Sequence, residues 1–103
     1  MPLDVTRAES HLDEARRRLE HARTSRLAQL RALSESGQSA EPSLTAEQKA
    51  ATKQVLKEIE EAFARIDDGR YGLCSACAKA IPAERLEILP YTRHCVACRR
   101  RAS

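Results

Sequence analysis

Aromatic residues and glycine are scarce in this chain, which has two Tyr, one Phe, no Trp and only three Gly in 103 residues. Such a composition suits long helices better than a compact domain with a large mixed core. The glycines are too scattered for a phosphate-binding loop, and no hydrophobic run approaches the ~20 residues of a membrane span. No nucleophile–base arrangement can be placed either, so we expect neither an enzyme nor a membrane protein.

The N-terminal residues contain no apolar run of the kind found in secretory signal peptides. We therefore expect a cytoplasmic protein, in which stable disulfides are rare. A chain this short often needs a metal ion to stabilise its fold. Charge is unevenly distributed: residues 1–68 hold eleven bases and thirteen acids, whereas residues 69–103 hold seven bases and two acids.

The most specific pattern contains all four cysteines, as the two pairs Cys74-x-x-Cys77 and Cys95-x-x-Cys98 with seventeen residues between them. This spacing is typical of a four-thiolate zinc site, in which each pair closes a tight turn and two turns complete a tetrahedron. Because four protein ligands leave no position for water, the pattern predicts one structural Zn²⁺ and no catalytic metal.

Other interpretations of the cysteines stay open at this point. They could form two disulfides or remain free thiols, and a redox role in which oxidation releases the metal is a further alternative. A thioredoxin-like site would need a βαβ pattern around one pair, which the sequence lacks. His94 could replace one sulfur, but four cysteines already fill a site, so we expect it to face solvent or support a ligand.

Two amphipathic segments precede the cysteines. We predict helices over residues 4–34 and 45–68, each opened by a capping box, Thr6-x-x-Glu9 and Thr45-x-x-Gln48, with Gly69 ending the second. Their apolar stripes recur near heptad spacing and consist of Leu12, Ala15, Leu19, Ala22, Leu30 and Leu33, with Leu27 on a neighbouring ridge, and of Val55, Ile59, Ala62 and Ile66.

The charged residues of these helices are predicted to lie on their surfaces, Arg65 among them. The arginines of the first helix could form a nucleic-acid patch, but a solvated face with pairs such as Glu14–Arg18 and Asp13–Arg17 is the more common arrangement. Residues 35–44, with Gly37 and Pro42, break the helical pattern and predict a tip loop.

The predicted fold class is mostly α: an antiparallel coiled-coil helical hairpin over residues 1–68, followed by a small four-Cys zinc finger over residues 69–103 with a short C-terminal helix. In the finger we expect Tyr71 at the junction with the hairpin and a short helix from Ala83 to Glu87. A last helix should begin near Cys95 and end near Arg101. A small core under the metal is expected from Ile81, Leu86, Ile88 and Leu89.

The last third of the chain resembles the DksA/TraR family of bacterial transcription regulators. The resemblance is carried by Tyr-Gly-x-Cys-x-x-Cys, then Ile-Pro-x-x-Arg-Leu, then Pro and a second Cys-x-x-Cys. The matching residues are Asp68, Gly69, Tyr71, Gly72, Cys74, Cys77, Ile81, Pro82, Arg85, Leu86, Pro90, Cys95 and Cys98.

This resemblance implies a regulator that binds RNA polymerase, not a specific DNA sequence, and places a helical hairpin in the secondary channel of the polymerase. The tip residues that would face the catalytic centre are Glu35, Ser39 and Glu41. Family members with full activity usually carry Asp-x-x-Asp-x-Ala near the tip, and this chain has no Asp between Glu14 and Asp67.

Guanosine tetraphosphate is the small molecule that the resemblance raises. Leu89 stands where a base is expected for it, whereas Arg99 retains a base directly after Cys98. A second hypothesis is a zinc-stabilised module that binds nucleic acid or another protein without regulating polymerase, because residues 99–101 add three arginines to an already basic finger.

Overall fold

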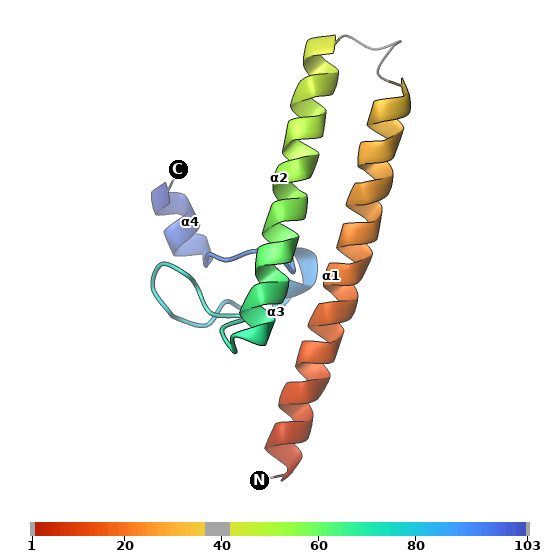
Figure 1. Ribbon diagram of the computed structural model, residues 1–103. Helices are drawn as coiled ribbons and strands as arrows, with labels where there is room; N and C mark the ends of the chain where they lie inside the picture. Colours follow the sequence, from red (N-terminus) through yellow and green to blue (C-terminus); the bar gives the residue numbers. More distant parts are fainter. Residues whose placement is uncertain (1, 37–41, 103) are drawn as a thin grey trace.

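A long helical hairpin and a small finger beside it make up the computed structural model, which describes residues 2–36 and 42–102. Helices α1 (Pro2–Ser36) and α2 (Pro42–Asp67) run antiparallel, and the short helices α3 (Ala83–Ile88) and α4 (Val96–Ala102) belong to the finger (Figure 1). The molecule is elongated, with extents of 58 × 30 × 21 Å. The predicted fold class, a helical hairpin followed by a four-cysteine finger, is confirmed.

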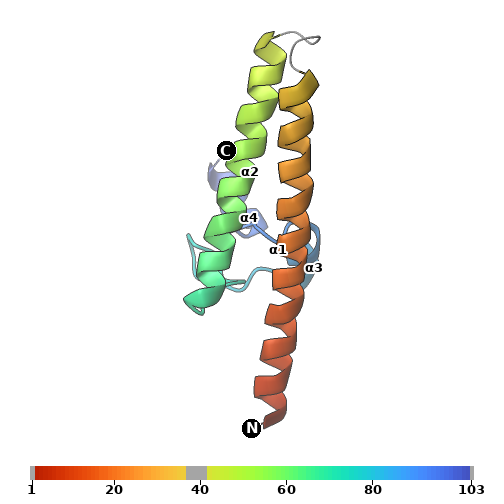
Figure 2. The ribbon, with the colours of Figure 1, turned by 45° about the vertical axis from the view of Figure 1, so that its right-hand side comes forward.

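The finger lies beside the C-terminal half of α2, and the last turn of α1 lies at the opposite end of the hairpin (Figure 1). A second view shows the same pairing of α1 with α2 and shows α1 continuing past the end of α2 (Figure 2). None of the helices in the described part of the chain has the length and apolar character that a membrane span requires.

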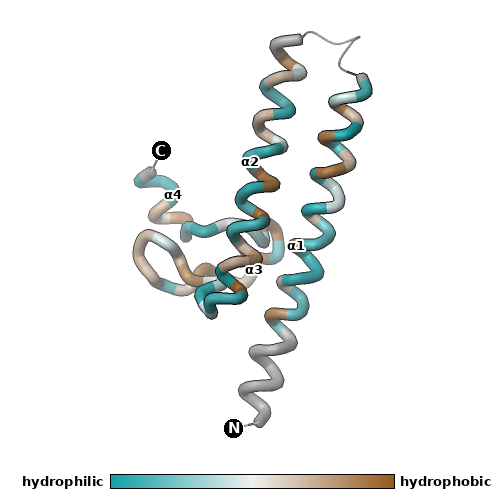
Figure 3. The backbone as a smooth tube through the Cα atoms, in the orientation of Figure 1, coloured by the Kyte–Doolittle hydropathy of each residue, from teal (hydrophilic) through white to brown (hydrophobic). Residues whose placement is uncertain are grey.

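One hydrophobic core joins α1 to α2 at the level of the finger. Its buried residues come from both predicted apolar stripes and are Ala15, Leu19, Ile59, Ala62 and Ile66. Hydrophobic segments alternate with hydrophilic ones along both helices, as an amphipathic pair requires (Figure 3). Leu27 stays 46% exposed, in keeping with its place on a neighbouring ridge.

Both long helices extend further than predicted. Helix α1 begins at Pro2 and α2 begins at Pro42, so Thr6 and Thr45 lie inside helices and the capping boxes predicted there are wrong. Proline suits the first turn of a helix because its φ is already near the helical value and its missing N–H would have no partner there. Pro42 therefore begins a helix at a position where we had expected a break.

The end of α2 is a Schellman motif, as the sequence indicated at Gly69. The N–H of Gly69 donates to the carbonyl of Ile66 (3.1 Å), and the N–H of Arg70 donates to the carbonyl of Arg65 (2.8 Å). Gly69 has φ +73°, a left-handed conformation that residues with a Cβ rarely adopt. This turn sets the direction in which the chain enters the finger.

Replacing Gly69 with Ala should lower the free energy of unfolding by about 1–2 kcal/mol, the cost of a left-handed L-residue. A Cβ at Gly69 would meet no atom within 4 Å, so the loss reflects backbone strain alone. Urea unfolding of the zinc-loaded protein measures it. Gly69→Asn is the matched control, since Asn tolerates this conformation better and should lose less stability; equal losses in both variants would contradict the prediction.

The finger has its own small core, from which two of the four predicted residues, Ile88 and Leu89, are missing. Ile81 is buried together with Cys74 and Cys98, and Leu86 packs against them. Ile88, expected in this core, is 79% exposed. Successive residues of an α-helix are rotated by about 100°, so Ile88 lies roughly opposite Leu86 on α3 and faces away from the metal cluster.

Candidate metal centre

The first cysteine pair lies in a tight turn held by backbone hydrogen bonds. Leu73 and Ala80 form an isolated antiparallel bridge. The N–H of Cys74 donates to the carbonyl of Lys79, and the N–H of Ala78 donates to the carbonyl of Cys74, both at 2.8 Å. Ala78 takes a left-handed φ of 64° to close the turn. The chain reverses directly after Cys77, which brings both sulfurs to one side.

The second pair lies at the start of α4. Cys95 precedes the first helical residue, and its carbonyl accepts the N–H of Arg99 at 2.9 Å. Cys98 follows almost one turn later, so the two side chains share a face. The N–H of Ser75 donates to the carbonyl of Arg93 (2.7 Å) and ties the first turn to the segment that leads into the second.

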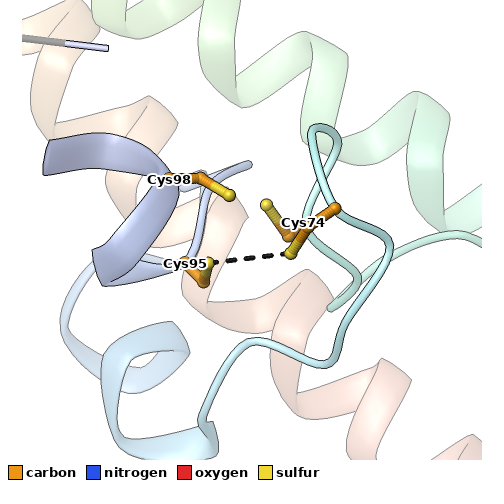
Figure 4. A group of neighbouring side chains, drawn as sticks. Cys74, Cys95 and Cys98 are labelled. Atoms are coloured by element: carbon orange, nitrogen blue, oxygen red, sulfur yellow. Dashed lines mark hydrogen bonds between the residues drawn. The ribbon is translucent and has the colours of Figure 1, made fainter. Parts of the chain in front are cut away.

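The two turns bring the four sulfurs into one cluster, in which all Sγ atoms lie within 4.8 Å of one another (Figure 4). The Sγ atoms of Cys77 and Cys95 are 3.8 Å apart. A tetrahedral zinc with Zn–S bonds of about 2.3 Å separates its sulfurs by about 3.8 Å, so the cluster fits one structural zinc. No disulfide joins these four cysteines, so all four sulfurs are available to bind one ion as thiolates.

His94 does not join the sulfur cluster of the described residues. Its backbone carbonyl instead accepts hydrogen bonds from Nε of Arg85 and Oγ1 of Thr92, both at 3.3 Å. These hydrogen bonds fix the position of the segment directly before Cys95. His94 thus contributes through its backbone to the position of the second pair.

Without a cation the pKa values of Cys74 and Cys98 are shifted in opposite directions. The backbone N–H of Cys95, followed by those of Cys77 and Ala76, lowers the pKa of Cys74 to about 6 despite its burial. Hydrogen bonds to the sulfurs of Cys95 and Cys77, together with burial, raise the pKa of Cys98 to about 12. Four negative sulfurs at this distance therefore require a cation, because only a nearby positive charge makes the last ionisation favourable.

Zinc binding should consequently release protons near pH 7. Cys98 is protonated in the metal-free protein at that pH and must lose its proton to bind a metal. The apparent affinity for zinc should therefore rise with pH between about pH 6 and 8, by at least about tenfold per pH unit for one released proton. Calorimetry in buffers of different ionisation enthalpy counts the protons directly, and a binding enthalpy that is identical in all buffers would contradict the prediction.

Arg65 joins the hairpin to the finger, although the sequence placed it on the surface. Its side chain is only 9% exposed, and Nη2 donates to the carbonyls of Tyr91 (3.4 Å) and Thr92 (3.3 Å). Burial lowers the pKa of Arg65, with Glu61 acting in the opposite direction. Its place between Ala62 and Ile66 of the buried stripe was the available signal, because a residue three after Ala62 shares its face of the helix.

Tyr71 lies at the same junction, as predicted. Its side chain packs against the hairpin core, and its hydroxyl donates to the carbonyl of Pro90 at 2.8 Å. Tyr71 and Arg65 together hold three consecutive carbonyls of the segment before Cys95. The finger is therefore fixed to α2 by hydrogen bonds as well as by apolar contacts.

Replacing Arg65 with Met should weaken the docking of the finger by about 1–3 kcal/mol, since the half-buried carbonyls of Tyr91 and Thr92 lose their donor while the apolar stem is kept. Faster transfer of zinc to a chelator and a lower unfolding midpoint would show it. Arg70→Met is the matched control, because Arg70 is exposed and pairs with Asp68 on the surface. Equal zinc-transfer rates in both variants would contradict the assignment.

The candidate tip residues are only partly within the described chain. Glu35 lies in the last turn of α1 with its side chain exposed, at the end of the hairpin far from the finger. Ser39 and Glu41 lie outside the described residues. The structure therefore tests neither their role nor that of Glu35.

Leu89 and Arg99 stand at the two positions considered above for binding guanosine tetraphosphate. Both line one cavity between α2 and the finger. It has a volume of about 450 Å³ and also contains Arg85, Arg93 and Glu58. The cavity is thus rich in cations, with one carboxylate and one leucine among them. Arg93 also lies 3.9 Å from Glu61 of α2, in a partly exposed ion pair.

Comparison with known proteins agrees with this geometry. Residues 69–103 match the family model of the prokaryotic dksA/traR C4-type zinc finger. An uncharacterized protein of Aquifex aeolicus is 44% identical over 43 residues, which are 42% of this chain and 30% of that protein. The RNA polymerase-binding transcription factor DksA of Buchnera aphidicola subsp. Schizaphis graminum is 33% identical over 48 residues, 47% of this chain and 32% of that factor.

These matches span about a third of the length of the curated relatives. The solved structure of transcription factor DksA2 from Pseudomonas aeruginosa resembles the chain more widely, with a TM-score of 0.52 over 91% of this chain and 78% of DksA2, at 23% identity. That likeness concerns the fold. Residues 69–103 therefore match the prokaryotic DksA/TraR C4-type zinc finger, and the hairpin and finger together have a DksA-like fold.

Proposed function

We propose that the protein is a cytoplasmic transcription regulator that binds RNA polymerase, with one structural zinc held by Cys74, Cys77, Cys95 and Cys98. The proposal is carried by the fold, a narrow hairpin whose base is fixed to a DksA/TraR-type finger. The Buchnera relative, whose name describes an RNA polymerase-binding factor, supports the choice of partner.

The shape of the hairpin suits entry into the secondary channel of the polymerase. Helix α1 has 35 residues, which correspond to a rod of about 52 Å. The finger would stay outside as a foot, because it broadens the hairpin beside the C-terminal half of α2, away from the tip (Figure 1). Glu35, Ser39 and Glu41 would then be the residues nearest the catalytic centre, where carboxylates influence bound magnesium electrostatically.

The cavity that contains Arg85, Arg93 and Arg99 extends this proposal to guanosine tetraphosphate. Three guanidinium groups favour a ligand with several phosphates. Leu89 and Glu58 line the same cavity, and neither contributes a positive charge, so we expect this chain to bind the alarmone weakly on its own. Equilibrium dialysis with and without polymerase separates a shared site from a site of the free protein.

Site-specific crosslinking to core RNA polymerase tests the proposed partner. A photoreactive amino acid at Glu35 should crosslink within the secondary channel, whereas the same residue at Lys79 of the finger should crosslink only at the outer surface. An unnatural side chain leaves the four cysteines unchanged. Absence of binding at micromolar concentrations, or identical crosslinks from both positions, would rule the proposal out.

Transcription measured at saturating protein distinguishes a tip that acts on the catalytic centre from one that only occupies the channel. Replacing Glu35 and Glu41 by Ala should alter transcription at saturating protein without lowering polymerase affinity. Unchanged transcription under these conditions would show that the two carboxylates have no regulatory role.

The basic finger favours a second candidate function, a zinc-stabilised module that binds nucleic acid. All three arginines of residues 99–101 lie in the last turn of α4. Binding to duplex DNA with a steep salt dependence and no binding to polymerase would select this alternative, because counterion release dominates such contacts.

A further inference from the structure

A groove between α1 and the end of α3 lies apart from the metal cluster, and it shares only Leu89 and Tyr91 with the arginine cavity beside α2. It has a volume of about 540 Å³. One wall is a face of α1 from Arg17 to Gln29, and the other is the segment from Glu87 to Tyr91. Neither the sulfur cluster nor Glu35 lines this groove, so the metal site and the hairpin tip do not account for it.

The second wall is apolar and contains the most exposed large hydrophobic side chain of those described. Ile88 is 79% exposed and is followed in the groove by Leu89, Pro90 and Tyr91. Tyr91 also packs against the hairpin core, and Pro90 is buried, so this wall is firmly supported. Ile88 therefore presents apolar surface that a bound partner can bury, next to Leu89 and Tyr91.

The α1 wall is basic. Its cationic residues are Arg17, Arg18 and Arg26, with the titratable His21 between them, and Glu87 is the one acid among the lining residues. Arg18 pairs with Glu14 at 3.4 Å. Asp13, which we had expected to pair with Arg17, pairs with Arg16 at 3.3 Å.

Arg17 and Arg26 therefore offer charge to an incoming ligand. Within residues 11–35 and 44–101, no carboxylate forms an ion pair with Arg17, and Arg26 donates to the neutral amide oxygen of Gln29 at 3.1 Å. The first and last groove residues of α1 are twelve positions apart, about 18 Å along the helix axis. That length corresponds to about three turns of a helix lying alongside α1.

We propose that this groove is a docking site for an acidic amphipathic helix of a partner protein. Its large apolar side chains would cover Ile88 and the half-buried Leu89. Its carboxylates would pair with Arg17 and Arg26, as in helix-in-groove recognition. The apolar wall favours a peptide over a phosphate backbone, because nucleic acid would leave Ile88 in water. The inference goes beyond polymerase binding and holds with or without it.

Selection from a displayed library of sixteen-residue helical peptides tests the groove with the zinc-loaded full chain. Selected peptides should combine Leu, Ile or Phe at helical spacing with Asp or Glu on the flanks. Their affinity, measured by fluorescence anisotropy, should fall at least about tenfold with Ile88→Ser and about fivefold with Arg17→Glu, and it should weaken as salt increases.

Two controls match these changes outside the groove. Leu44→Ser removes another exposed hydrophobic side chain, and Arg31→Glu reverses an exposed charge on α1, so both should leave peptide affinity unchanged. Zinc content and circular dichroism verify that each variant is folded.

Several results would overturn the proposal: no micromolar binder from the library, binders that are basic, or binders unaffected by both groove variants. Duplex DNA that competes through Arg17 would assign the face to nucleic acid instead. Dimerisation of the chain that Ile88→Ser abolishes would assign it to a second copy, in contradiction to a partner helix.

Discussion

Loss of zinc is expected to unfold residues 69–103 while the hairpin keeps most of its helix. Structural zinc sites supply on the order of 10 kcal/mol of apparent folding free energy, which is comparable to the whole stability of a small domain. The buried core beside the metal cluster consists of the two cysteines Cys74 and Cys98 and one aliphatic side chain, Ile81. Without the metal this core is too small to hold the two turns together.

Circular dichroism distinguishes unfolding of the finger from unfolding of the whole chain. Helices α3 and α4 contribute six and seven residues, whereas α1 and α2 contribute 35 and 26. Chelation or Cys98→Ser should therefore reduce the helical signal by about a sixth, because about that share of the helical residues of α1 to α4 lies in the finger.

The fluorescence of Tyr71 and Tyr91 should change in the same experiment, since both side chains pack at the junction of finger and hairpin. Ser75→Ala is the control, because it removes an exposed hydroxyl between the cysteines without removing a sulfur. If Cys98→Ser retained one zinc per chain and an unchanged unfolding midpoint, the four-cysteine site would be refuted.

Leu19→Ala should have the second largest effect, a loss of about 2–5 kcal/mol in the free energy of unfolding. Leu19 of α1 and Ile59 of α2 are the two largest side chains that are fully buried among the described residues, and both belong to the single core of the hairpin. Truncation leaves a cavity between α1 and α2, and the packed helices can close it only partly. Urea unfolding followed by helical circular dichroism measures the loss.

Leu27→Ala is the matched control, because it makes the same chemical change on the same helix at a side chain that is 46% exposed. It should cost less than about 1 kcal/mol. A similar loss in both variants would mean that α1 does not pack on α2 as described, whereas a loss confined to Leu19 confirms the core.

Electrostatic contacts between α1 and α2 are expected to contribute less to the free energy of unfolding than this core does. Arg23 bridges α1 and α2 through Glu60 (2.9 Å) and also lies over the ring of Phe63, with Cζ 4.8 Å from the ring centre. Its hydrogen bonds to Glu60 and Glu20 raise its pKa, but the group is exposed to solvent. Exposed ion pairs contribute little to stability because water screens them. The register of α1 against α2 therefore depends mainly on the apolar side chains of the core.

Local features were predictable where one short segment determines the conformation. Two Cys-x-x-Cys pairs predicted the metal cluster, because each turn positions its own sulfurs. The heptad stripes predicted which side of each helix is buried, and Gly69 predicted the end of α2 because its left-handed turn excludes most other residues.

Helix starts were predicted less well. Thr6 and Thr45 looked like capping residues, yet each helix begins a turn earlier at a proline. Capping boxes and prolines at the first turn are both favourable N-terminal signals, and their relative strength depends on packing against the other helix, which the local sequence does not contain.

By itself the sequence determined the helical hairpin, the four-cysteine cluster and the buried stripes, because helical period and turn chemistry act over a few neighbouring residues. Only the tertiary structure decided that Arg65 is buried beneath Tyr91 and Thr92, and that Ile88 faces an arginine-rich wall of α1. These environments arise where segments about 26 or more residues apart meet. No local pattern encodes them, because burial of one side chain depends on the orientation of the other segment.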